Sequence, residues 1–276
     1  MSAGHPTEAA HTAHTAHSPH PAEGPPRLAI DDHGRATITL ARPRHLNRLH
    51  REDLLALQEH FAALARGGVA RVLVLTGSGR AFCAGFNLEE LREGSAAARD
   101  PQLFEHTVDA LEALPLPTIA RLNGGVFGGA TDFALACDFR VGIEGMELRM
   151  PAARLGLHYY PTGLRRYVSR LGLAAAKRLF LLAETVPAEE LLRIGYLDQL
   201  ASAATLDAHV DALAAALAEG APLAVQGMKR SLDEIARGEF DLARLRAREE
   251  RCAASEDLRE GLAAFAHKRR PRFKGR

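Results

Sequence analysis

The fold of this sequence is decided by two segments, RAFCAGFNL at residues 80–88 and NGGVFGGATD at residues 123–132. Each follows an apolar run typical of a β-strand, Val72 to Leu75 and Thr118 to Leu122, and the second leads into a helix-like stretch at residues 128–137. Small residues and glycines at such points let a ligand approach the backbone closely. Two backbone N–H groups, one from each loop, can then meet on one oxygen atom and stabilise the negative charge that a carbonyl develops during a reaction.

The two segments resemble the two motifs of the crotonase superfamily, also called the enoyl-CoA hydratase/isomerase family. The first family motif reads roughly A-F-x-A-G-x-D, and residues 81–87 read AFCAGFN. The second reads roughly N-G-x-x-x-G-G-x-x-E, and Asp132 takes the last place here. Both motifs occur in order, each after a predicted strand, and the resemblance runs from about Leu28 to the C-terminus.

The resemblance implies an enzyme that acts on an acyl-CoA thioester through an enolate-like intermediate. The N–H groups of Phe86 and Gly129 are implied to form an oxyanion hole, with Ala84, Gly85 and Gly128 among the residues that bind the substrate. Gly129 stands at the start of the predicted helix, where the helix dipole favours negative charge. No cofactor is implied, because coenzyme A is part of the substrate.

The composition agrees with this interpretation and gives no sign of a nucleic-acid or membrane partner. The 276 residues are 47% hydrophobic and carry a formal net charge of +1. A charge so close to zero gives no overall attraction to an anionic partner, and no apolar run approaches the roughly 18 residues of a membrane span. Cys83, Cys137 and Cys252 show neither paired nor metal-ligand spacing. We therefore expect reduced cysteines, no metal site and a cytoplasmic location.

The chain divides into three parts. Residues 1–26 are rich in His, Ala and Pro, a composition that predicts a disordered tail. They also lack the apolar core that a secretory signal would have. Residues 27–200 alternate between strand and helix patterns, which favours an α/β fold. Residues 201–276 are predicted to be helical. The resemblance supplies the topology, a crotonase-like spiral of β-β-α repeats whose C-terminal helical region builds a homotrimer or a hexamer made of two trimers.

The carboxylates depart from the pattern of the family's hydratases, which use two glutamates to hold and activate one water molecule. The first glutamate position is Asp132, whose side chain is shorter by one methylene. The second is Ala152, which cannot transfer a proton. Ordinary two-glutamate hydration is therefore in doubt. Asp132 is a candidate base or water ligand, and the alternative is a helix-start carboxylate that the dipole stabilises.

The segment that follows, LHYYPTGLRR at residues 157–166, carries an imidazole and two phenols where hydratases have small residues. His158 and Tyr159 are candidate catalytic residues, and Tyr160 is a candidate substrate-binding residue. All three equally suit a packed, hydrogen-bonded loop. Methylmalonyl-CoA decarboxylase, a member of the superfamily, is similar in lacking the second glutamate and in having a tyrosine where Tyr159 stands. Its first motif, however, carries a histidine that aligns with Phe86.

Three functions remain open at this point. The first is the family-level activity of an enoyl-CoA hydratase/isomerase. The second is decarboxylation of a malonyl-CoA-type substrate, which needs no strong base because the departing carbon dioxide leaves an enolate in the oxyanion hole. The third is a CoA-binding family member that has lost catalysis.

The C-terminal run FAHKRRPRFK at residues 265–274 is strongly basic. The resemblance suggests that Phe265 and Lys268 hold the adenine and phosphates of CoA, on their own subunit or a neighbouring one. Arg44 is a candidate for the same role, and a solvated tail is the alternative interpretation.

If the basic C-terminus binds the nucleotide of CoA, an acyl-CoA will bind more tightly than an acyl-pantetheine, which lacks that nucleotide. The reason is that the phosphate oxygens of the nucleotide accept charge-assisted hydrogen bonds from basic side chains. Calorimetry with both ligands measures the difference, and Lys268→Ala should reduce it. Equal affinities for the two ligands would exclude the nucleotide contact.

Overall fold

The computed structural model describes residues 23–91 and 100–276. The predicted N-terminal tail therefore lies mostly outside the described residues. The first strand, β1 (Gly24–Ile30), begins three residues before the expected boundary at residue 27. Arg27 pairs with Thr39, and a β-bulge follows between Arg27 and Gly24. The bulge lets Gly24 pair with Ala41, which extends the strand toward the N-terminus.

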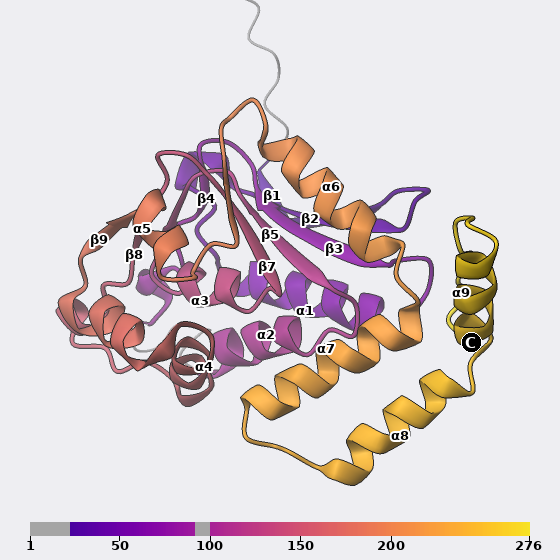
Figure 1. The fold of residues 1–276 in the computed structure, drawn as a ribbon. Helices are drawn as coiled ribbons and strands as arrows, with labels where there is room; N and C mark the ends of the chain where they lie inside the picture. Colours follow the sequence, from indigo (N-terminus) through magenta and orange to yellow (C-terminus); the bar gives the residue numbers. More distant parts are fainter. Residues whose placement is uncertain (1–22, 92–99) are drawn as a thin grey trace, which may run out of the picture.

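The strands form two sheets (Figure 1). The larger sheet has the order β1-β2-β3-β5-β7-β10, where β2 is Arg35–Ala41, β3 Val72–Gly77, β5 Thr118–Leu122, β7 Phe139–Ile143 and β10 Gln199–Ala201. The smaller sheet has the order β4-β6-β8-β9, with β4 Ala81–Cys83, β6 Gly125–Phe127, β8 Glu147–Arg149 and β9 Thr185–Pro187. Pairing is antiparallel for β1–β2 and β8–β9 and parallel elsewhere.

From β3 to α4 the chain repeats one pattern: a strand of the larger sheet, a strand of the smaller sheet and then a helix. The helices of this part are α1 (Arg51–Ala65), α2 (Leu103–Glu112), α3 (Ala130–Leu135), α4 (Pro161–Lys177) and α5 (Ala188–Arg193). The chain order is thus β3-β4-α2, then β5-β6-α3, then β7-β8-α4, with short helical turns η1 (Pro43–His45), η2 (Leu88–Leu91), η4 (Ala152–Leu155) and η5 (Arg178–Leu182) between elements. This is the predicted spiral of β-β-α repeats.

The larger sheet is buried on both faces, which explains the unbroken apolar run of β3. Leu73 and Leu75 pack into the main core with the inward side of α1. Val72 and Val74 point to the other face, where α6 (Leu206–Ala218) covers them in a second cluster. Both sides of the strand are therefore packed, and its end is held firmly where the first motif begins.

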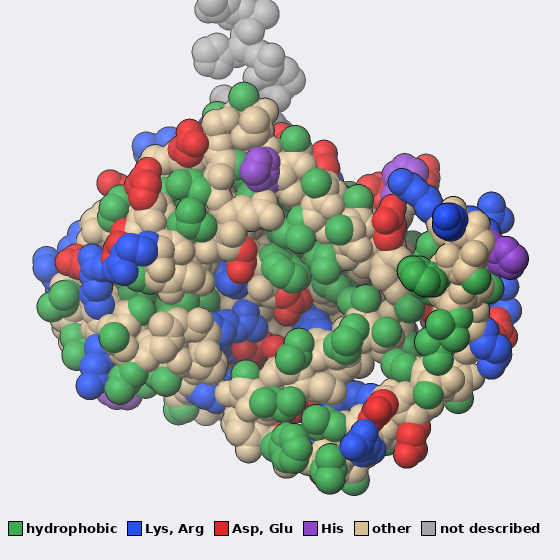
Figure 2. Space-filling view, in the orientation of Figure 1, with side chains coloured by type: hydrophobic (Ala, Val, Ile, Leu, Met, Phe, Trp, Pro, Cys, Tyr) green, Lys and Arg blue, Asp and Glu red, His purple; other side chains and the backbone are tan. Residues whose placement is uncertain are grey.

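The last three helices, α7 (Pro222–Ala236), α8 (Leu242–Ala253) and α9 (Glu256–Ala266), extend away from the sheets as an arm (Figure 1). The arm exposes apolar side chains of Met228, Leu232, Phe240, Leu242, Leu262 and Phe265. Figure 2 shows hydrophobic side chains gathered along it. So much exposed apolar surface is typical of a region that a partner covers.

The helices that the structure describes lie within residues 23–91 and 100–276. No single helix there is long and apolar enough to cross a bilayer, and only the pair α6 and α7, bent by 106°, reaches that length and composition together.

Candidate active site

The two predicted loops meet, because β4 and β6 are paired in parallel in the smaller sheet. Gly85 has a φ of +90°, and a Cβ atom there would lie 2.6 Å from the Phe127 carbonyl and 3.1 Å from the Gly129 nitrogen. Only glycine permits this backbone conformation and this approach without strain. Asn123 joins the loops further, since its Nδ2 donates to the Gly79 carbonyl at 2.8 Å.

The Phe86 and Gly129 amides have no acceptor among the described residues, and neither has the Ala130 amide that follows, whereas other amides of the two loops are bonded. On the first loop, Ala84 N donates to the Leu46 carbonyl and Asn87 N to the Leu49 carbonyl, both at 2.8 Å. On the second, Gly128 N donates to the Arg149 carbonyl at 2.9 Å. Phe86 and Gly129 are half-buried, and amides at the start of a helix are free to bind an external acceptor. Two unused donors on adjoining loops therefore mark a site that can receive an oxygen atom.

Asp132 lies in the first turn of α3, one turn beyond Gly129, and its side chain is completely buried. Its Oδ2 accepts hydrogen bonds from the Tyr160 hydroxyl and from Arg166 Nη1, the latter at 2.6 Å. Its Oδ1 is buried with no partner among the described groups. Burial raises the pKa of the Asp132 carboxyl, and the charge of Arg166 and the Tyr160 hydroxyl oppose that rise only in part.

Arg166 on α4 is the cation that holds this carboxylate. It is fully buried and also contacts Asp109 at 2.7 Å and Glu112 at 2.9 Å, both on α2. Burial disfavours the Arg166 charge, but Asp132 and Glu112 raise its pKa, so the guanidinium is always charged. Burial likewise raises the pKa of Glu112, and the hydrogen bond and charge of Arg166 bring it below its ordinary value. One arginine thus ties α2, α3 and α4 together.

Aromatic rings lie beside the carboxylate. Tyr159 and Tyr160 are stacked with centroids 4.3 Å apart, and the Tyr159 hydroxyl donates to the Tyr160 hydroxyl at 3.3 Å. Burial and the charge of Asp132 raise the pKa of both phenols, so both are protonated at neutral pH. Phe104 on α2 lies 6.0 Å from Tyr160 and 6.0 Å from Phe86. The site therefore combines two free amide donors, one buried carboxylate and an aromatic wall.

Residues 32–276 match the family model for enoyl-CoA hydratase/isomerase. The chain belongs to the enoyl-CoA hydratase/isomerase family. The 2,3-dehydroadipyl-CoA hydratase of Escherichia coli is 34% identical over 247 residues, which cover 87% of this chain and 94% of that protein. The crotonyl-CoA hydratase of Syntrophomonas wolfei is 28% identical over 249 residues, 86% of this chain and 94% of that protein.

Solved structures agree with the family and the fold. The enoyl-CoA hydratase from Bacillus anthracis superposes with a TM-score of 0.84 at 28% identity, covering 92% of this chain and all of that one (100%). An enoyl-CoA hydratase/carnithine racemase from Magnetospirillum magneticum gives a TM-score of 0.86 at 27% identity, covering 92% and 97%. The predicted family and the crotonase-like α/β fold are confirmed, and the chain is an enzyme acting on acyl-CoA.

Of the predicted site residues of this enoyl-CoA hydratase/isomerase family member, the structure brings together Ala84, Gly85, Phe86, Gly128, Gly129, Asp132, Tyr159 and Tyr160. Ala152, at the second glutamate position, is buried and offers no polar group. His158 is exposed, and its Nδ1 lies 2.8 Å from the carbonyl of its own neighbour, Tyr159. The catalytic role predicted for His158 gains no support from this position.

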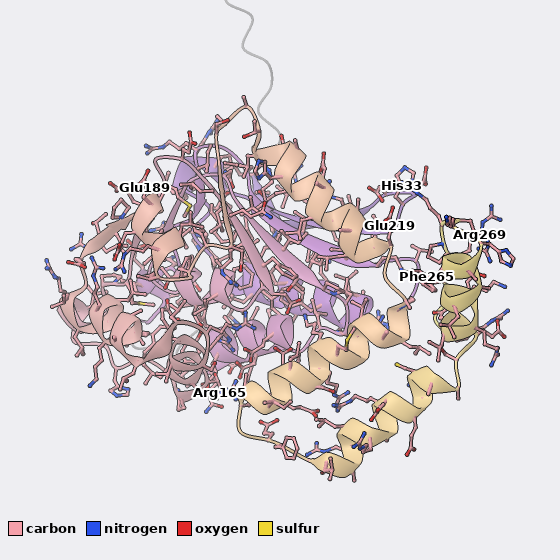
Figure 3. All side chains as sticks on the ribbon, in the orientation of Figure 1. His33, Arg165, Glu189, Glu219, Phe265 and Arg269 are labelled. Carbon is pink, nitrogen blue, oxygen red and sulfur yellow. The ribbon has the colours of Figure 1, made fainter. Side chains whose placement is uncertain are left out.

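Two of the three residues predicted to bind the CoA nucleotide, Phe265 and Lys268, lie on or just after α9, away from α3 and the site of their own chain. Phe265 is 87% exposed on α9, well separated from α3 (Figures 1 and 3). Lys268 lies two residues beyond the end of that helix and has a positive φ of 51°. Arg44 is exposed on η1, two residues before Leu46, whose carbonyl accepts the Ala84 amide of the first loop. The basic tail is not free either. Asp257 accepts the amides of Lys274 and Gly275, at 2.7 and 2.8 Å.

Sequence reasoning missed two residues of the site, Phe104 and Arg166. Arg166 is one of three arginines among residues 165–170, and the pattern does not show which of them is buried. Phe104 begins a helix far from both motifs in sequence. Metal binding has no visible basis in residues 23–91 and 100–276, where no group of three or more His, Cys, Asp or Glu side chains could hold an ion.

Replacing Arg166 with Met should destabilise the protein by about 3–5 kcal/mol, because the fully buried Asp132 carboxylate loses its cationic partner and Glu112 keeps only Arg165 and Arg170. Arg165 is the matched control, since its side chain is 33% exposed and pairs with Glu112 alone. Arg165→Met should cost less than about 1 kcal/mol. Urea unfolding followed by circular dichroism measures both variants, and equal losses would show that Arg166 is not the structural centre of the site.

Proposed function

We propose that this acyl-CoA enzyme moves a proton with one carboxylate, Asp132, and isomerises enoyl-CoA thioesters in preference to hydrating them. The observation that carries the proposal is the unpartnered Oδ1 of Asp132. Its sister oxygen, Oδ2, is already occupied by Arg166 and Tyr160. An unpartnered buried oxygen is costly unless a substrate or water meets it.

The thioester oxygen would accept hydrogen bonds from the Phe86 and Gly129 amides. Asp132 Oδ1 would then take the proton from C2 of a 3-enoyl thioester, and the electron pair of that C–H bond would move into a dienolate whose charge rests on the oxygen. Return of the same proton to C4 gives the 2-enoyl isomer. Each amide donor is worth about 3–4 kcal/mol in such a transition state. The raised pKa of Asp132 makes its carboxylate a stronger base than an ordinary aspartate.

Hydration by the two-carboxylate route is disfavoured because position 152 offers only a methyl group. A water molecule at the site would be held by a single carboxylate, and that carboxylate is drawn toward Arg166. Decarboxylation of a malonyl-type thioester is the second candidate. It is supported by the Tyr159 hydroxyl, whose bond to Tyr160 is long at 3.3 Å and whose proton can turn toward a substrate carboxylate.

We also propose that the enzyme works in the cytoplasm as a homotrimer, or as a hexamer of two trimers, without a cofactor other than the CoA of its substrate. The exposed apolar side chains of the α7–α9 arm support a partner subunit. The distance of Phe265 and Lys268 from the site of their own chain suits contacts with CoA bound to a neighbour. All of Cys83, Cys137 and Cys252 are free, as a reducing compartment would keep them.

A panel of 3-enoyl-, 2-enoyl- and malonyl-type CoA thioesters, followed by chromatography and mass spectrometry, tests the reaction. We expect 3-enoyl-CoA to change retention time at constant mass, with little water gain from crotonyl-CoA. Asp132→Asn should lower the isomerisation rate at least about 100-fold, the low end for a general base. Rapid hydration of crotonyl-CoA would contradict the proposal, and so would an active Asp132→Asn variant. Loss of carbon dioxide would identify the decarboxylase instead.

A further inference from the structure

The ring of Phe104 occupies the space beside the predicted oxyanion hole. A Cβ atom on Gly129 would lie 2.7 Å from Phe104 Cζ and 3.1 and 3.3 Å from its two Cε atoms. The outer edge of the ring therefore rests directly on the glycine that carries one of the two free amides. Phe104 is not a motif residue, and it comes from a different helix, α2.

The position of this ring is fixed by the helix that carries it. Leu103, Thr107, Val108 and Leu111 are all buried on α2. The Thr107 hydroxyl donates to the Leu103 carbonyl at 2.7 Å and accepts from Gln58 Nε2 at 3.0 Å. The backbone that carries the ring is therefore anchored on the buried side of α2.

Two aromatic neighbours show where the Phe104 ring lies relative to the rest of the site. It lies against Phe86, whose amide is the other oxyanion donor, and edge-on against Tyr160. Tyr160 is bonded to Asp132, the carboxylate that would meet C2 and C4 of the substrate. The ring thus lies beside both residues of the predicted oxyanion hole and beside the tyrosine that is bonded to Asp132.

We propose that Phe104 is the residue that sets the acyl specificity of this enzyme, by limiting it to short, planar acyl groups. The inference rests on the proposed site for the thioester carbonyl. The rings of Phe86, Phe104 and Tyr160 would bound the space for the acyl group, and a short, flat group would meet their faces. A longer chain would meet the Phe104 ring, which lies against Gly129 and Tyr160.

Binding of saturated thioesters tests this without any chemistry. Butanoyl-CoA and octanoyl-CoA are titrated calorimetrically into the full-length wild type and into the Phe104→Ala and Phe104→Leu variants. Each methylene newly buried raises affinity about fourfold. Admission of two methylenes by Phe104→Ala should therefore raise the octanoyl-to-butanoyl affinity ratio more than tenfold over wild type. Phe104→Leu, which keeps most of the apolar volume, should give an intermediate ratio and carries the test if the alanine variant does not fold.

The outcomes separate this inference from the proposed function. An unchanged octanoyl-to-butanoyl ratio in the folded variants would overturn the role of Phe104 while leaving the thioester site intact. Failure of the wild type to bind either thioester would contradict the proposed function itself, and the specificity inference with it.

Discussion

The arrangement of the site depends on one buried ion pair, between Arg166 and Asp132. Both side chains are completely shielded from solvent, and the arginine also engages Asp109 and Glu112. Helices α2, α3 and α4 are thereby joined at one point. A buried pair adds little net stability compared with apolar packing, but removal of one partner is severe. The pair determines geometry, since it occupies one carboxylate oxygen and leaves the other unpartnered.

Two positions, 132 and 152, carry smaller side chains here than the glutamates of the family's hydratases, and both changes affect how water can be held at the site. The shorter Asp132 is held by Arg166 and Tyr160, and Ala152 supplies no second carboxylate. The space near the reacting carbons is instead lined by the rings of Tyr159, Tyr160 and Phe104. Such a site has two amides for an enolate oxygen and one carboxylate in place of two. That difference is the basis of our proposal that the enzyme transfers a proton within the substrate in preference to adding water.

Much of this could be predicted from the sequence, because the motifs specify local backbone geometry. Gly85 and Gly129 show where two loops meet, and the strands before them place both loops at neighbouring positions. The contacts of Arg166 and Phe104 could not be predicted, since they depend on how α2 and α4 pack against α3 and no local pattern encodes that packing. The start of β1 at Gly24 was missed for a similar reason, as a bulge permits a pairing that composition does not reveal. The hydrogen bonds that hold the basic C-terminal tail could not be predicted either, because their acceptor, Asp257, meets the tail only in the folded chain.

The central claim is that the Asp132 carboxylate transfers the proton, and the pH dependence of kcat/KM tests it most directly. In the wild type, isomerisation should decline on acidification through a pKa above the ordinary aspartate value of 3.8, because burial raises the pKa of this group. The Tyr160 hydroxyl donates to the ionised form, so Tyr160→Phe should raise that pKa and move the acidic decline to higher pH. An acidic limb that stays in place when this hydrogen bond is removed would contradict the account.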